Sequence, residues 1–136
     1  QFVDADDIDV LYYEKPYFVV PADDLADAAR RIADLGPQYV VVKGGAGLPG
    51  DEAVDVLWDG TDVHVFRAPK VGEERVSGAG CIFAAAITAE LAKGAEIGEA
   101  VAFAKEFTTA GINGRVSGHT PFDTVWQGAF VDALEG

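Results

Sequence analysis

Two short segments of the 136-residue chain carry residue types that could bind a phosphate group. The first, Ser77-Gly78-Ala79-Gly80-Cys81, directly precedes an apolar, alanine-rich run. If that run is a helix, its first N–H groups have no partner inside the helix, its dipole adds positive potential, and the small residues let an anion approach. The segment therefore predicts an anion site at Gly78, Ala79 and Gly80. Alternatively, the glycines only allow a tight turn into a buried helix.

Cys81 adds a reactive group to this segment. The start of a helix favours the thiolate form of a cysteine, which could then act as a base or a nucleophile. A single cysteine is also a typical small buried hydrophobe. The two interpretations differ in whether the side chain is accessible.

The second segment, Lys43-Gly44-Gly45, follows the apolar run Tyr39-Val40-Val41-Val42. Ligands of open α/β sheets bind beyond the carboxyl ends of the strands, and two glycines leave space beside the lysine. Lys43, Gly44 and Gly45 are therefore candidates for a nucleotide-phosphate site. The alternative is an ordinary solvated lysine at the end of a strand.

The rest of the pattern predicts the elements that would position these segments. Apolar residues at helical spacing follow Pro21 and follow the glycine turn, which predicts a helix after each. Short apolar runs predict strands. In the two runs on either side of Asp59-Gly60, apolar and polar residues alternate as in the strands of a hairpin. The alanine-rich composition of the helix after the glycine turn predicts that it is buried. The expected helices span residues 22–35, 81–93, 99–112 and part of 122–134, and the expected strands contain Tyr17, Tyr39, Val54 and Val63.

Composition restricts the class of protein. Hydrophobic residues make up 49% of the chain, and 23 acidic against 10 basic side chains give a net charge of −13. We expect one folded domain that binds neither nucleic acid, which needs clustered Lys and Arg, nor an anionic membrane. A single cysteine and the lack of any apolar run of about 18 residues indicate a soluble, cytoplasmic protein. The sequence contains no methionine, so we expect a fragment, a trimmed product or an engineered chain.

No metal site is predicted from the histidines. His64 and His119 each lack a second histidine or cysteine at the spacing that metal ligands require. The pairs of adjacent carboxylates along the chain are most simply explained as solvated surface.

The phosphate-binding candidates and their neighbours together resemble one family. From about Ala22 to Gly114 the sequence resembles the C-terminal half of hydroxymethylpyrimidine (phosphate) kinases and the related pyridoxal kinases, in the ribokinase-like superfamily. The resemblance implies an α/β fold, a three-layer half-domain with a small sheet covered by helices. The stretches that carry it are residues 26–37, Val41-Val42-Lys43-Gly44-Gly45, residues 48–57, Gly78-Ala79-Gly80-Cys81 and residues 87–94.

The resemblance also implies an activity: ATP-dependent transfer of a phosphoryl group to the hydroxymethyl group, or its phosphate, of a pyrimidine or pyridine vitamin precursor. In that case the backbone N–H groups of residues 78–81 would bind the transferring phosphoryl, and Cys81 would activate or position the substrate hydroxyl. Lys43, Gly44 and Gly45 would line the nucleotide site.

The sequence departs from the family in three places. Val76-Ser77 stands where the family usually has Thr or His before the glycine turn, and Ile82 and Ala84 replace a usual Thr and Ser. The family's N-terminal half, with the substrate-binding segment and the element that organises Mg²⁺, has no counterpart here. The resemblance therefore implies ATP and Mg²⁺. Because the substrate-binding and Mg²⁺-organising elements have no counterpart here, we expect the chain to bind nucleotide even if it does not catalyse transfer.

Residues 2–21 are similar to a different protein. The stretch Ile8–Pro21 resembles a strand pair of bacterial Ku, which binds DNA ends, although the net charge of −13 opposes DNA binding. We expect an extended segment at residues 1–21 followed by the kinase-like residues 22–136. Either the chain is a chimera of unrelated pieces or the likeness to Ku arose by chance.

Two functions are therefore open. The first is a kinase, or the remnant of one, that binds a nucleotide and a small-molecule substrate. The second is a non-catalytic module, chimeric or designed, that self-associates and has no phosphotransferase activity. In both cases the open edges of a small sheet predict self-association, first of all as a homodimer.

Overall fold

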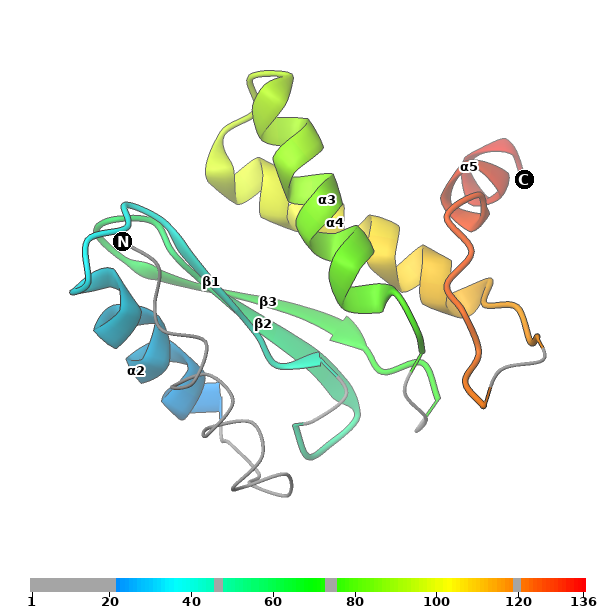
Figure 1. Ribbon diagram of the computed structural model, residues 1–136, viewed down its shortest axis with the longest axis horizontal. Coiled ribbons are helices and arrows are strands. Elements are labelled where there is room, and N and C mark those ends of the chain that lie inside the picture. Colours follow the sequence, from blue (N-terminus) through cyan, green and yellow to red (C-terminus); the bar gives the residue numbers. More distant parts are fainter. Residues whose placement is uncertain (1–21, 46–47, 73–75, 119–120) are drawn as a thin grey trace.

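The computed structural model describes residues 22–45, 48–72, 76–118 and 121–136 (Figure 1). The predicted strand at Tyr17 and the segment similar to Ku lie outside the described residues. All other predicted elements are present, with bounds shifted by a few residues except at the C-terminus. The elements are α2 (Ala22–Ala33), β1 (Val40–Lys43), β2 (Glu52–Trp58), β3 (Val63–Pro69), α3 (Ala79–Ala92), α4 (Ile97–Asn113) and α5 (Ala129–Glu135).

The three strands form an antiparallel sheet in the order β1-β2-β3. The predicted hairpin joins β2 to β3, with Trp58 paired to Val63. At its turn, the side chain of Asp59 accepts hydrogen bonds from the N–H groups of Thr61 and Asp62, both at 2.8 Å, and lies 2.5 Å from His64 Nε2. The hydrogen bond from the Asp62 N–H, then those from His64 and Thr61, lower the pKa of Asp59 to about 2.

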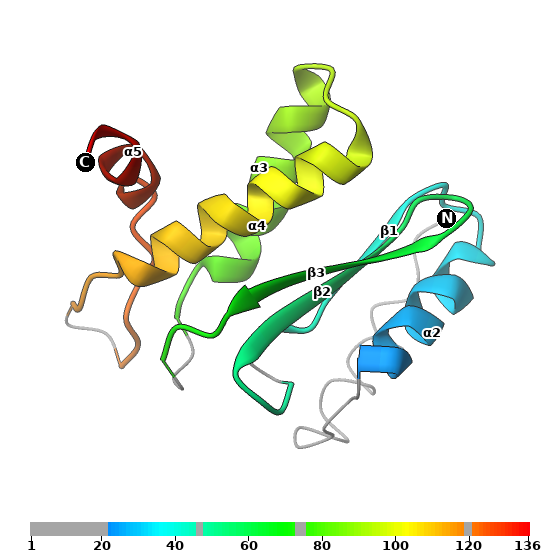
Figure 2. The same ribbon diagram turned by 180° about the vertical axis from the view of Figure 1, so that it is seen from behind.

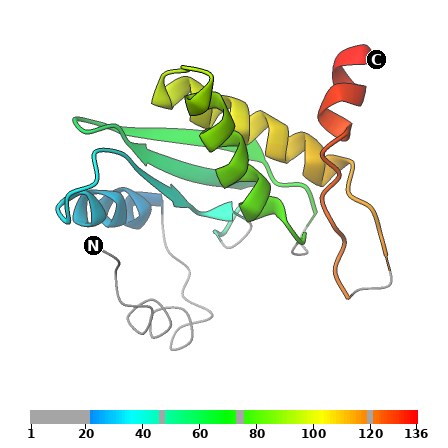
Figure 3. The same ribbon diagram turned by 45° about the horizontal axis from the view of Figure 1, so that its top comes forward.

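Helices cover both faces of the sheet, as Figure 3 shows in profile. Alternation along β2 sends Val54 and Val56 toward α2, where they pack with Leu25 and Ala29. It sends Leu57 to the opposite face, where the core contains buried side chains of α3 and α4: Phe83, Ala86, Val101 and Ala104. The predicted three-layer α/β arrangement is therefore confirmed.

Helix α3 is not the buried helix that its composition predicted. Only Phe83 and Ala86 are buried along it, whereas Ala84, Ala85 and Ala89 are exposed. The helix packs against α4, seen from behind in Figure 2, and its outer side has no cover among the described residues. The prediction failed because an alanine-rich helix has no polar face that would mark the side turned to solvent.

The C-terminal region is less helical than predicted. Helix α5 begins only at Ala129, and the described residues 121–128 before it form bends, one bridge and a turn in place of a helix. Thr124 forms isolated bridges with both Ser77 and Val116, which ties this segment to the residue just before the glycine turn. No helix in the described parts of the chain is both long and apolar enough to cross a membrane.

Candidate functional site

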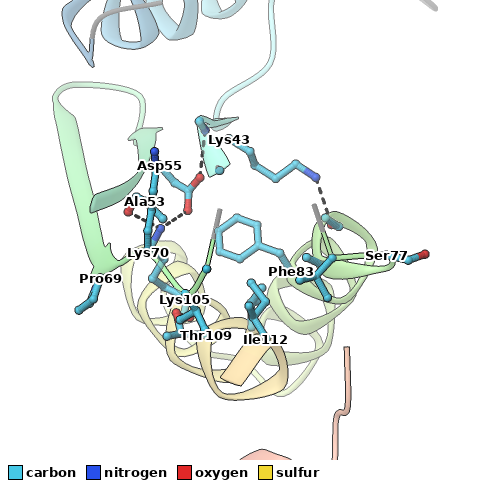
Figure 4. A pocket seen from close by; sticks show the side chains of 18 of the residues that line it. Lys43, Ala53, Asp55, Pro69, Lys70, Ser77, Phe83, Lys105, Thr109 and Ile112 are labelled. Carbon is cyan, nitrogen blue, oxygen red and sulfur yellow. Dashed lines mark hydrogen bonds and ion pairs between the residues drawn. The ribbon is translucent and has the colours of Figure 1, made fainter. Parts of the chain in front are cut away.

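A cavity of about 650 Å³ lies where the end of β1, the start of α3 and the inner side of α4 meet (Figure 4). Its volume is within the range of small-molecule sites. Five of the seven residues singled out from the sequence line it, although they come from two distant segments: Lys43, Gly44, Gly45, Ala79 and Gly80. The other two, Gly78 and Cys81, flank the second segment and are not among the lining residues.

Lys43 joins the two predicted segments. As the last residue of β1 it lies on the sheet face turned toward α3, and its Nζ donates a hydrogen bond to the carbonyl oxygen of Gly80 at 3.1 Å. A Cβ on Gly80 would lie 3.2 Å from this ammonium group. The cation therefore lies directly beside the backbone of the glycine turn.

The glycine turn leaves backbone N–H groups open. Gly78 has a φ of 85°, a left-handed conformation that favours glycine, and α3 begins at the next residue. The first helical hydrogen bond runs from the N–H of Ile82 to the carbonyl oxygen of Gly78, at 3.0 Å. Within the described part of the chain, the N–H groups of residues 79–81 have no acceptor. They are therefore free to bind an anion.

The residue before the turn is held by the C-terminal segment. The N–H of Ser77 donates to the carbonyl oxygen of Asp123 at 2.7 Å, and the N–H of Val125 donates to the carbonyl oxygen of Ser77 at 3.1 Å. Arg115 and Ser117 each donate a side-chain hydrogen bond to the Asp123 carboxylate. The position of the turn therefore depends on Asp123 and Val125, which lie more than 40 positions further along the chain.

Cys81 is exposed in the first turn of α3. It is not the small buried hydrophobe that was one interpretation of the sequence. Because Gly80 lines the cavity and Cys81 does not, the thiol lies next to the turn but outside the cavity wall. A group held by the turn could therefore be reached from the cavity on one side and from Cys81 on another.

Sequence reasoning missed an ion pair in the cavity wall. Lys105 Nζ of α4 lies 2.6 Å from Asp55 Oδ2 of β2, and the two side chains are only 10% and 8% exposed. Lys105 also donates to the carbonyl oxygen of Ala53 at 2.8 Å, and Asp55 Oδ1 accepts from the N–H of Gly44 at 3.1 Å. In Figure 4 the ring of Phe83 lies between this pair and the side chain of Lys43.

The cavity is cationic although the chain is acidic. Lys43, Lys70 and Lys105 line it, against the single carboxylate of Asp55 among the described residues. Lys70 donates a hydrogen bond to the carbonyl oxygen of Leu48, and the buried hydroxyl of Thr108 has no partner in the described structure. With a net charge of −13 on the whole chain, this local excess of positive charge favours an anionic ligand here.

Comparison with known proteins agrees with this geometry. The sequence profile of the family described as phosphomethylpyrimidine kinase matches residues 13–123. The chain belongs to the phosphomethylpyrimidine kinase family. The matched residues include all of those that line the cavity, and the match ends between α4 and α5.

Individual relatives include a pyridoxine kinase and a hydroxymethylpyrimidine/phosphomethylpyrimidine kinase. The chain is 52% identical over 90 residues to a pyridoxine kinase of Bacillus subtilis. These 90 residues make up 66% of this chain and 33% of the relative. It is 44% identical over 88 residues to a hydroxymethylpyrimidine/phosphomethylpyrimidine kinase of Synechococcus elongatus, 65% of this chain and 34% of the relative. The chain therefore spans about a third of the length of these relatives.

The fold agrees with the sequence comparison. An ADP complex of Bacillus subtilis pyridoxal kinase superposes with a TM-score of 0.79 and 42% identity, over 83% of this chain and 44% of that one. The described residues therefore have the fold of part of a ribokinase-like kinase.

The described residues do not fit a magnesium ion held by the protein itself. No group of three or more His, Cys, Asp or Glu side chains converges in the described ranges. Asp55, the carboxylate that lines the cavity, is already bonded to Lys105 and Gly44. Proteins usually bind Mg²⁺ through one or two carboxylates together with waters and phosphate oxygens of the substrate. No step proposed below therefore depends on a magnesium ion.

Proposed function

We propose that this chain binds the phosphates of ATP in the cavity and serves ATP-dependent phosphoryl transfer to a hydroxymethyl-bearing vitamin precursor, of the pyridoxine or hydroxymethylpyrimidine (phosphate) type. One observation carries the proposal: Lys43 and the unpaired N–H groups of Ala79 and Gly80 meet at one cationic cavity. Backbone N–H groups at a helix start together with a lysine are suited to phosphate oxygens.

In the proposed reaction, a bond forms between an acceptor oxygen of the substrate and the γ-phosphorus of ATP. The acceptor oxygen belongs to the hydroxymethyl group or, in the phosphorylated precursor, to its phosphate. The bond from the γ-phosphorus to the bridging oxygen of ADP breaks, and a hydroxyl acceptor releases its proton. Phosphoryl transfer needs positioning and charge stabilisation more than covalent help from the protein. Lys43 and the N–H groups of residues 79–81 would stabilise the negative charge on the transferring group.

Cys81 has a separate role in this proposal. Since it is exposed beside the turn and outside the cavity wall, it would meet the acceptor hydroxyl while the cavity holds the nucleotide. The sulfur of Cys81 would then accept the hydroxyl proton or orient the hydroxyl toward the phosphorus.

Calorimetric titration of the chain with ATP tests the binding step, and phosphorylation of pyridoxine and of hydroxymethylpyrimidine tests transfer. We expect saturable heat with ATP. We expect a low rate of phosphoryl transfer, because the chain spans only about a third of the length of its relatives. A folded chain that gives no saturable heat at millimolar ATP would contradict the proposal. That result would favour the alternative of a non-catalytic module.

We also propose that the chain forms a homodimer. Strand β3 pairs only with β2 in the described structure, so one of its edges is open for pairing with another chain. Sedimentation equilibrium across a range of concentrations tests this, and a mass of 14.3 kDa at every concentration would contradict it.

A further inference from the structure

The Asp55–Lys105 ion pair is difficult to explain by stability alone. Its side chains are 8% and 10% exposed, so both charges have lost nearly all of their hydration. Apolar residues of similar volume often stabilise a fold as well as a buried ion pair does, or better. The pair joins β2 to α4, where Leu and Met side chains could fill the same space.

The hydrogen bonds of the pair lead to the end of β1. Asp55 Oδ2 accepts a hydrogen bond from Lys105 Nζ at 2.6 Å, while Oδ1 accepts one from the N–H of Gly44 at 3.1 Å. Lys105 is itself fixed by the carbonyl oxygen of Ala53 at 2.8 Å. The carboxylate is thus oriented from α4 on one side and bonded to the first residue beyond β1 on the other.

The position of the Gly44 backbone determines where its two neighbours in the cavity wall lie. Its N–H also donates to the carbonyl oxygen of Val54 at 3.0 Å, and its neighbours Lys43 and Gly45 both line the cavity. A Cβ at Gly44 would collide with Val54 and would lie 2.5 Å from Leu48 Cδ1. The backbone is therefore held closely against β2 where the lysine leaves the sheet.

We propose that Asp55 and Lys105 are positioning residues: Lys105 orients the Asp55 carboxylate, which holds Gly44 so that Lys43 and Gly45 face the nucleotide phosphates. This inference rests on the proposed function, because it assigns the pair to the nucleotide site. It differs from a direct contact between Lys105 and the phosphates, which the position of Lys105 in the cavity wall would also allow.

Two double variants of the full chain separate these roles. Asp55→Leu with Lys105→Met removes both the ion pair and the acceptor for Gly44, and we expect it to fold as stably as the wild type. ADP titration should nevertheless show a Kd at least tenfold higher, and the Gly44 amide proton should exchange at least tenfold faster. Asp55→Asn with Lys105→Met keeps an oxygen that can accept from Gly44, so its Kd should return toward the wild-type value.

A matched control is the exposed pair Glu52–Arg67, which links β2 to β3 outside the cavity wall. Glu52→Gln with Arg67→Met should leave the Kd for ADP unchanged. A purely structural role for the buried pair would likewise leave the Kd of its apolar replacement within twofold of wild type, and would overturn the inference. Equal loss of affinity in both buried double variants would also overturn it, because Lys105 would then contact the ligand directly.

Failure of the proposed function would give a different result. If the wild-type chain binds no ADP, nucleotide binding is rejected, and the exchange rate of the Gly44 amide decides whether the pair holds the turn. Slow exchange that is lost in the Leu–Met variant and regained in the Asn–Met variant supports positioning. Exchange in the Leu–Met variant that is as slow as in the wild type overturns it. If the Leu–Met variant does not fold, Asp55→Ala with Lys105→Met removes the same acceptor, and slow exchange in that variant overturns the inference in the same way.

Discussion

Lys43 and Asp55 are partners across the β1–β2 ladder, but their side chains bond to different helices. Lys43 donates to the carbonyl oxygen of Gly80 at the start of α3, whereas Asp55 pairs with Lys105 of α4. Lys105 engages the Asp55 carboxylate, and the ammonium group of Lys43 lies at the glycine turn. This separation leaves a cation available for the phosphates of a nucleotide.

Removing the charge of Lys43 should weaken nucleotide binding. Lys43→Met keeps most of the length of the side chain but removes its contact with Gly80 and its charge. We expect the Kd for ATP to rise by about tenfold or more, since charge-assisted contacts to phosphate contribute roughly 1.5–3 kcal/mol. Calorimetry measures the change. Lys43→Arg should retain most of the affinity, and a Lys43→Met chain that binds ATP normally would remove Lys43 from the site.

Replacing Cys81 should affect transfer and not nucleotide binding. The thiol is exposed and outside the cavity wall, so Cys81→Ala should leave the Kd for ATP within about twofold. Phosphorylation of pyridoxine should fall by about 100-fold or more if the sulfur of Cys81 accepts the proton or orients the hydroxyl. A radiometric transfer assay beside the ATP titration measures both quantities. Unchanged turnover would exclude the thiol from the reaction.

Gly44 should be intolerant of a side chain. Gly44→Ala would place a Cβ against the Val54 carbonyl oxygen and 2.5 Å from Leu48 Cδ1, so we expect a loss of about 1–3 kcal/mol in the free energy of unfolding. Gly98→Ala, in the first turn of α4 with nothing within 4 Å, is the matched control and should be neutral or slightly stabilising. Urea denaturation compares the two. Equal stability of both variants would contradict the close packing at Gly44.

The turn between β2 and β3 should titrate at unusually low pH. Because the pKa of Asp59 is lowered from 3.8 to about 2, its contribution to stability is fully present above pH 3.8 and is lost as the pH falls through about 2. NMR titration of the Asp59 side-chain carboxyl carbon measures this directly. His64→Gln should raise the pKa only part of the way, since the Asp62 N–H is the largest cause of the shift. A titration midpoint near 3.8 in the wild type would contradict the turn geometry.

The glycine-rich segments and most elements could be predicted because they depend on local pattern. Gly78 needs a left-handed φ before a helix, and the runs on either side of Asp59-Gly60 alternate as hairpin strands do. The meeting of Lys43 with Gly80 follows from the resemblance to a kinase family and not from spacing, since 37 residues separate them.

The Asp55–Lys105 pair was missed although the sequence contained a signal for it. Asp55 interrupts the apolar run of β2, and Lys105 follows the buried residues Val101 and Ala104 on the inner side of α4. A charged residue at a position that periodicity assigns to the core requires a buried partner of opposite charge. Which partner it meets depends on how α4 lies across the sheet, and local pattern does not determine that.

Every role proposed for these residues depends on the binding of nucleotide phosphates between the end of β1 and the start of α3. Titration of the ¹⁵N-labelled chain with ADP, followed by amide chemical shifts, tests it most directly. We expect saturable shifts concentrated at Gly44, Gly45 and residues 79–81, and we expect inorganic pyrophosphate to reproduce part of them. Amide shifts that stay unchanged at millimolar ADP, or that saturate only at residues remote from this cavity, would contradict it.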